Sequence, residues 1–137
     1  LAQYARVDNR QYRLLKAATP GAYTFILEAT KEVPRRVAHP QRKTIGLRVP
    51  DHKGLRALLA LHRAPLLATT LIPPGQSEPL NDAQTIVDAW GHALAAVIDS
   101  GASPMQPTTV VDLTPMGDGD APQLIRHGAG DAARLGL

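Results

Sequence analysis

A turn and a buried strand follow one another in the segment Thr19-Pro20-Gly21-Ala22-Tyr23-Thr24-Phe25-Ile26-Leu27. Proline and glycine interrupt helices and form turns, so the first three residues mark the end of any preceding helix. The β-branched, aromatic and apolar residues of Tyr23–Ala29 are typical of a strand buried in a sheet. Upstream, Asp8 is a suitable cap for a short helix in which Tyr12 and Leu15 are the apolar positions. The segment therefore predicts a helix, a turn and a buried strand, in that order.

Strands and helices alternate through the rest of the chain. The composition and alternation of residues predict further strands over Thr44–Val49, Pro65–Ile72, Ala95–Asp99, Thr108–Leu113 and Leu124–His127. One helix is expected after Asp51, with an apolar stripe made of Leu55, Leu58, Leu59 and His62. A second is expected from Asn81 or Asp82, with a core-facing side made of Ile86, Val87, Trp90 and Leu94. This order, with strands alone at the end, indicates an α/β fold with a mixed sheet covered by helices.

The composition limits the class of protein. The chain has 137 residues, 44% of them hydrophobic and 20% charged, so we expect residues 1–137 to form a single domain with a packed core. It begins at Leu1 rather than at methionine, and we expect its amino-terminal part to be incomplete. The absence of cysteine excludes thiolate metal sites and cysteine nucleophiles, and it fits a cytoplasmic location. The apolar stretch Leu55–Ile72 is interrupted by His62, Arg63 and Pro65, which argues against a membrane protein.

Charge is divided unevenly along the sequence. Residues 1–63 carry 13 Lys and Arg against 4 Asp and Glu, whereas residues 64–137 carry 2 against 8. Clustered cations favour a polyanionic partner, and the densest cluster lies in the exposed connection Lys31–Lys43. The same asymmetry would arise if a basic half folds against an acidic half, and the sequence leaves both interpretations open.

Several common catalytic motifs are absent. The chain has no phosphate-binding loop of the Gly-x-x-x-x-Gly-Lys type and no serine nucleophile elbow. The run Gly128-Ala129-Gly130 lacks the third glycine of a dinucleotide-binding fingerprint. The five histidines show no paired spacing for a metal, so we assign no metal site. No catalytic residue is assigned either.

Polar residues at predicted strand ends form the remaining candidate site. They are Arg48, the pairs Thr69-Thr70 and Thr108-Thr109, and Arg126 on the last strand. Arginine offers a forked, permanently charged donor to phosphate or carboxylate, and threonine hydroxyls donate to the remaining oxygens. Two alternatives stay open: the threonines serve packing in strands, and Arg48 pairs with Asp112 or Asp51.

Four motifs cover nearly the whole chain in order. They are Thr19–Leu27, Lys43–Pro50, Pro107–Leu113 and Ile125–Gly128. In this order they resemble the YrdC-like (threonylcarbamoyl-AMP synthase) family, an α/β fold with a twisted open mixed sheet. The run Lys31–Arg36, and the segment Thr69-Thr70-Leu71 with Pro74-Gly75 after it, resemble the YciO-type branch of that family. Relative to the family, we expect the chain to lack the amino-terminal third.

The resemblance implies a function and a set of residues. Synthases of this family use ATP, threonine and bicarbonate to make threonylcarbamoyl-adenylate, the intermediate for threonylcarbamoyladenosine in tRNA, and the family is described as binding double-stranded RNA. On that analogy ATP, alone or with magnesium, would contact Thr24, Arg48, Thr70, Thr108, Thr109 and Arg126. Double-stranded RNA or tRNA would contact Lys31, Arg35, Arg36, Arg42 and Lys43.

Two departures from the synthase pattern keep alternatives open. Thr70 and Ile72 stand where the synthases carry a serine-x-asparagine pair, and isoleucine cannot hydrogen-bond a phosphate. The family's Lys-x-Arg element is expected upstream of Leu1. We therefore expect a nucleotide- and RNA-binding YciO-type domain; the alternatives are an active synthase, a hydrolytic or salvage activity in the same cleft, and a non-catalytic interaction domain.

Overall fold

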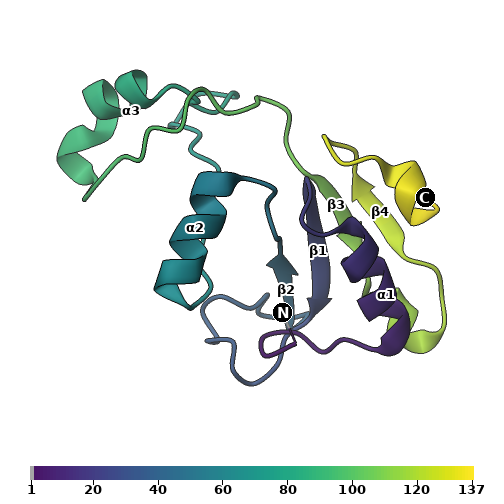
Figure 1. Cartoon of the computed structure of the whole chain (residues 1–137). Coiled ribbons are helices and arrows are strands. Elements are labelled where there is room, and N and C mark those ends of the chain that lie inside the picture. The colour runs from purple at the N-terminus through teal and green to yellow at the C-terminus, as the bar shows by residue number, and fades with distance from the viewer. Residues whose placement is uncertain (1) are drawn as a thin grey trace. The chain divides into compact units, whose positions relative to one another are not determined.

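A computed structural model describes residues 2–137 (Figure 1). The chain divides into two compact units. The first consists of residues 2–51 together with Pro107–Leu137, and the second of His52–Gln106. Each unit is described by itself below. The expectation that residues 1–137 form a single domain stays a prediction.

The first unit is built on a four-stranded mixed sheet with the strand order β2-β1-β3-β4. Its central strands, β1 (Tyr23–Glu28) and β3 (Thr109–Asp112), run parallel to each other. Strand β2 (Thr44–Leu47) pairs antiparallel with β1, and β4 (Gln123–Arg126) pairs antiparallel with β3. The open mixed sheet expected from the sequence is therefore confirmed.

Helix α1 (Asn9–Ala18) begins at a capping box. The Asp8 carboxylate accepts hydrogen bonds from two backbone amides of the first turn, and the Gln11 side chain accepts from the Asp8 amide. Gln11 also donates through Nε2 to the Leu113 carbonyl oxygen at 2.8 Å, which turns Gln11 and Leu15 toward the interior. Tyr12 is 57% exposed, so it does not share the buried side of α1 with Leu15, the other apolar position expected for this helix.

The core of the first unit lies beside β1 and β3. Phe25, Leu27, Val111 and Leu113 are at most 1% exposed. Alternate residues of β1 are buried, as expected for a strand with one face on the core. Two short 3₁₀ helices, η2 (Thr114–Asp118) and η3 (Ala132–Leu135), contribute Met116 and Ala132 to the buried set.

The second unit contains α2 (Lys53–His62), α3 (Ala83–Trp90) and the 3₁₀ helix η1 (Gly91–Ala93). Asp82 caps α3 as expected. In α2 the cap is His52, whose Nδ1 accepts from the Leu55 amide, so the helix begins one residue later than a cap at Asp51 would place it.

Two predictions for the second unit are wrong. Pro65–Ile72 and Ala95–Asp99 are not strands, because no segment of His52–Gln106 forms a ladder and a strand requires a hydrogen-bonded neighbour.

The apolar stripes of α2 and α3 are less buried than expected: neither helix contains a buried residue. No described helix is long and apolar enough to cross a membrane.

Candidate anion-binding edge of the sheet

Four candidate residues lie at one edge of the sheet. The parallel strands β1 and β3 begin at this edge, and their antiparallel partners β2 and β4 end there (Figure 1). Thr24 is the second residue of β1, and Thr108 immediately precedes β3. Arg48 immediately follows β2, and Arg126 is the last residue of β4. Residues from four separate segments of the sequence are thus brought to one edge.

Thr24 and Thr108 form a hydroxyl pair. Their Oγ1 atoms are 2.8 Å apart, and both residues are half-buried. When one hydroxyl donates to the other, the accepting hydroxyl keeps its own hydrogen. The pair therefore has one O–H left to donate to an anion.

The Arg126 side chain is hydrogen-bonded to the backbone of Thr108, one member of this pair. Its Nη2 donates to the Thr108 carbonyl oxygen at 2.9 Å, and Arg126 is paired with Val110 across β4 and β3. The side chain is exposed, and guanidinium carries five N–H donors. The charge and most of the donors of Arg126 are therefore accessible to a ligand.

Thr109 differs from its neighbour Thr108. It is 0% exposed, its hydroxyl donates to the Gly130 carbonyl oxygen at 2.5 Å, and the same oxygen accepts from the Gly128 amide at 3.0 Å. Both partners belong to the segment after β4. The geometry gives Thr109 a contact inside the protein, and its expected contact with nucleotide stays a prediction.

Arg48 is exposed at the same edge. The next residue, Val49, accepts through its carbonyl oxygen from the Gly21 amide at 2.9 Å, which fixes the chain beside the turn before β1. The Asp112 carboxylate accepts from the amide and hydroxyl of Thr114 at 2.9 and 2.7 Å. The Asp112 carboxylate is thus hydrogen-bonded within its own turn. The alternative that Arg48 pairs with Asp51 stays open.

Thr70 belongs to the second unit and does not follow a strand. It is exposed, and its carbonyl oxygen accepts from the Ile72 amide at 3.0 Å. The predicted position of Thr69 and Thr70 at a strand end is wrong, because the segment Pro65–Ile72 has no hydrogen-bonded neighbouring strand. A contact of Thr70 with nucleotide stays a prediction.

The basic connection between β1 and β2 is exposed, as expected. Its five cations, Lys31, Arg35, Arg36, Arg42 and Lys43, are all at the surface. The connection is closed at its base by a hydrogen bond from the Ala29 amide to the Lys43 carbonyl oxygen at 2.8 Å, and Val33 is buried beneath it at 7% exposure. The loop therefore has one apolar anchor and a cationic outer surface.

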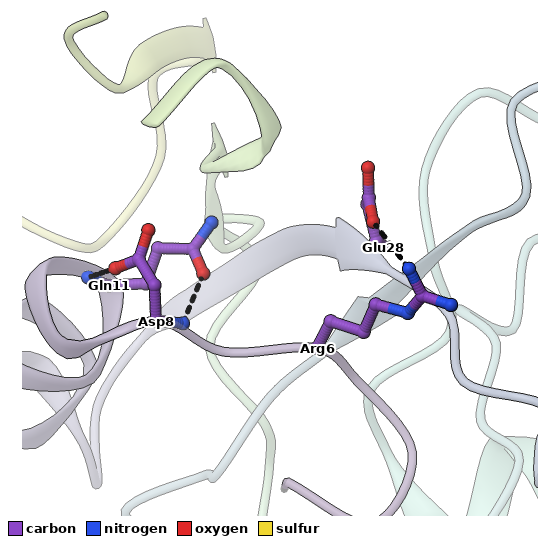
Figure 2. Close-up of polar contacts among 4 residues, drawn as sticks. All are labelled: Arg6, Asp8, Gln11 and Glu28. Atoms are coloured by element: carbon purple, nitrogen blue, oxygen red, sulfur yellow. Dashed lines mark hydrogen bonds and ion pairs between the residues drawn. The ribbon is translucent and has the colours of Figure 1, made fainter. Parts of the chain in front are cut away.

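A groove at the opposite edge was not found from the sequence. It has a volume of about 420 Å³, and its polar lining comes from Arg6, Asp8, Gln11, Glu28, Thr114 and Asp118. Figure 2 shows Arg6 reaching Glu28, with Nη1 3.8 Å from Oε2, while Asp8 and Gln11 bond the start of α1. The Arg6 and Glu28 side chains are 70% and 61% exposed, so the pair contributes little to stability.

The charges of this groove do not suit an anion. One arginine stands against three carboxylates, and Asp8, Gln11 and Thr114 already use polar atoms in bonds within the protein. No three His, Asp or Glu side chains among residues 2–137 are placed to hold a metal ion. The edge with Arg48 and Arg126 is therefore the better candidate site.

A mixed sheet with flanking helices makes this chain an α/β protein, with threonine hydroxyls and two arginines at one edge of the sheet. Residues 1–128 match the Sua5, YciO and YrdC family, which is described as "Telomere recombination", and the chain belongs to this family. It is 46% identical to an uncharacterized protein of Haemophilus influenzae over 134 residues, covering 97% of this chain and 63% of that protein. It is 31% identical to the threonylcarbamoyl-AMP synthase of Bos taurus over 110 residues, covering 80% of this chain and 34% of the synthase.

Solved structures show the same fold. The crystal structure of Escherichia coli YciO matches with a TM-score of 0.87 at 42% identity, covering 98% of this chain and 63% of that one. A variant of P. abyssi Sua5 matches with a TM-score of 0.79 at 25% identity, covering 92% of this chain and 37% of that one. The expected fold and family are confirmed, and the chain spans somewhat less than two thirds of the length of YciO.

Proposed function

We propose that this chain binds the phosphates of a nucleotide, with ATP as the probe of choice, at the sheet edge formed by Thr24, Arg48, Thr108 and Arg126. The observation that carries the proposal is the Arg126 guanidinium, which is tied to the Thr108 backbone beside the Thr24–Thr108 hydroxyl pair. A fixed cation next to a free hydroxyl donor matches the charge and acceptor oxygens of a phosphate. The similarity to a threonylcarbamoyl-AMP synthase, whose name includes an adenylate, also supports a nucleotide as the ligand.

Magnesium fits this edge only as a companion of ATP. The described residues offer no group of carboxylates that could hold a metal ion. Magnesium would therefore be bound by the phosphate oxygens of ATP. The donors on the protein are cationic or hydroxylic, and they suit the nucleotide directly.

The test of this proposal is the affinity for ATP of the wild type and of Arg126→Gln. Loss of a charge-assisted contact should weaken ATP binding by about tenfold. Arg134→Gln is the matched control, because Arg134 is an exposed arginine of the same unit that lies on η3, outside the proposed ligand set. Equal affinity of the wild type and the Arg126 variant would refute the proposed site.

A second function, binding of double-stranded RNA or tRNA, is proposed for the connection that carries Lys31, Arg35, Arg36, Arg42 and Lys43. The supporting observation is that all five cations are exposed on a loop that is anchored by buried Val33. Clustered, accessible cations release counterions when they contact phosphates, which supplies affinity without base contacts. We also propose that the protein takes part in RNA modification in the cytoplasm.

Threonylcarbamoyl-AMP synthesis is the candidate activity, favoured by the similarity to the named synthases. In the proposed reaction the threonine amine and bicarbonate form a carbamate with loss of water, and a carbamate oxygen displaces pyrophosphate from the α-phosphate of ATP. Arg48 and Arg126 would neutralise the phosphates. Pyrophosphate release that requires all three substrates would support it. Ile72 replaces a hydrogen-bonding residue of the synthase pattern, so Ile72→Asn should increase this pyrophosphate release. If neither the wild type nor the variant releases pyrophosphate faster when threonine and bicarbonate are added, the chain binds ATP without synthesis.

A further inference from the structure

The segment that follows β4 is packed directly against the candidate edge. A Cβ on Gly128 would overlap the Pro107 carbonyl oxygen and the backbone of Thr108. A Cβ on Gly130 would overlap the Tyr23 ring and the Ala22 carbonyl oxygen. Glycine is therefore required here by close approach, and the segment has no room to shift toward the sheet.

One buried hydroxyl holds this segment in place. Thr109 Oγ1 donates to Gly130 and accepts from Gly128, and the Ala129 amide between them donates to the Pro107 carbonyl oxygen at 2.8 Å. Consecutive residues are thus bound to the start of β3. The Thr109 hydrogen is already used, so this hydroxyl cannot donate to a ligand without releasing Gly130.

The segment is joined to the ligand-facing groups by short lengths of chain. Gly128 lies two residues after Arg126, and Thr108 directly precedes Thr109. Arg126 donates to the Thr108 carbonyl oxygen, and the Thr108 hydroxyl contacts Thr24. Fixing Gly128 and Gly130 to Thr109 therefore fixes the end of β4, and with it the separation between the Arg126 cation and the hydroxyl pair.

We propose that Thr109 is a positioning residue, which sets the spacing of Arg126 and Thr108 for a phosphate and does not itself contact the nucleotide. This inference rests on the proposed nucleotide binding. It changes the role expected for Thr109 from the sequence, and it divides the Thr108-Thr109 pair into one ligand-facing and one inward-facing hydroxyl. Small displacements of positioned groups have large effects on ligand interactions.

The test compares the ATP affinity of Thr109→Val and Thr109→Ser in the whole chain. Valine keeps the shape of threonine and removes the hydroxyl, whereas serine keeps the hydroxyl. The matched control is Leu27→Val, which removes a methylene from a core residue that is 0% exposed and lies outside the proposed ligand set. Affinity is measured in sucrose, which favours the folded state of less stable variants, and folding is checked by circular dichroism.

We expect Thr109→Val to bind ATP about tenfold more weakly, Thr109→Ser to bind within about twofold of the wild type, and Leu27→Val to bind like the wild type despite a lower Tm. If Thr109→Val does not fold, Gly128→Ala provides the second variant, because its new methyl group pushes the same segment away from Thr108.

The outcomes separate this inference from the function on which it rests. A wild type that does not bind ATP refutes the proposed function and the positioning role together. A wild type that binds ATP, with folded Thr109→Val or Gly128→Ala of equal affinity, refutes the positioning role alone. Equal loss of affinity in Thr109→Val and Leu27→Val would show that Thr109 acts through stability and not through position.

Discussion

Two neighbouring threonines at this sheet edge, Thr108 and Thr109, differ in their hydrogen-bond partners. Thr108 is half-buried and shares one hydrogen bond with Thr24, which leaves a hydrogen for a ligand. Thr109 is fully buried and has two partners in the segment after β4. Exposure and hydrogen-bond capacity, more than residue identity, therefore separate groups that can bind a ligand from groups that hold the backbone.

Gln11 makes a residue-scale prediction about stability. Its buried amide joins the Asp8 amide at the start of α1 to the Leu113 carbonyl oxygen beyond β3. Gln11→Leu leaves both backbone groups without this partner, which should lower the free energy of unfolding by about 1–3 kcal/mol. Chemical denaturation of the variant measures this loss, with exposed Gln41→Leu as the control. A change as small as that of the control would contradict the structural role of Gln11.

At the scale of elements, α3 depends on its cap. The backbone amide of Thr85, and then the Thr85 hydroxyl, donate to the Asp82 carboxylate and hold the pKa of Asp82 below its ordinary value of 3.8. Because the pKa of Asp82 is lowered in the folded state, the cap stabilises α3 fully above the ordinary value of 3.8. This stabilisation is lost as the pH falls through the lower pKa of the folded state.

The pH dependence of α3 is therefore a second prediction. The Thr85 amide resonance should shift as the pH falls from 5 to about 2, with a midpoint below 3.8. Asp82→Asn keeps an acceptor oxygen and does not titrate, so its Thr85 amide should not show this transition. A transition of the same size in both proteins would assign the effect to another group.

The elements that the sequence predicted well are those whose signal is local. Tyr23–Glu28 is rich in β-branched, aromatic and apolar residues, and alternate residues of it are buried. Asp8 and Asp82 are caps beside their own helices. Pro65–Ile72 has the composition of a strand but has no ladder partner in its unit, and partners far away in sequence cannot be read from composition. Tyr12 was misplaced because Gln11, a polar residue, has a buried partner in Leu113.

The candidate site was predictable only as a set of residues. The motifs pointed to Thr24, Thr108 and Arg126, and the sheet brings these to one edge. The inward direction of Thr109 depends on where the chain returns after β4, which spacing does not reveal. The groove lined by Arg6 and Glu28 was missed because it joins residues of separate elements that carry no shared motif.

At the scale of the whole molecule, both explanations of the uneven charge have support. Residues 1–51 carry ten Lys and Arg against four Asp and Glu, residues 107–137 carry two against four, and the two segments share one sheet. A basic part thus folds with an acidic part. Five of the ten cations nevertheless lie on the exposed connection between β1 and β2, where they remain accessible to a polyanion.

The salt dependence of RNA binding tests that accessibility. Replacing Arg35 and Arg36 together by Gln should weaken binding to a short RNA duplex and reduce the slope of log affinity against log salt by about 1–2. Arg134→Gln, an exposed arginine outside the connection, should leave the slope unchanged. Binding that is insensitive to salt, or an equal effect of the control, would exclude phosphate contacts by this connection.

The most direct measurement of the central claim is an ATP titration followed by the backbone amide resonances of the whole chain. Nucleotide bound at the sheet edge predicts saturable shifts at Thr24, Arg48, Thr108 and Arg126, with much smaller changes at Arg6 and Glu28 in the groove at the opposite edge. The absence of saturable shifts, or shifts centred on Arg6 and Glu28, would contradict it.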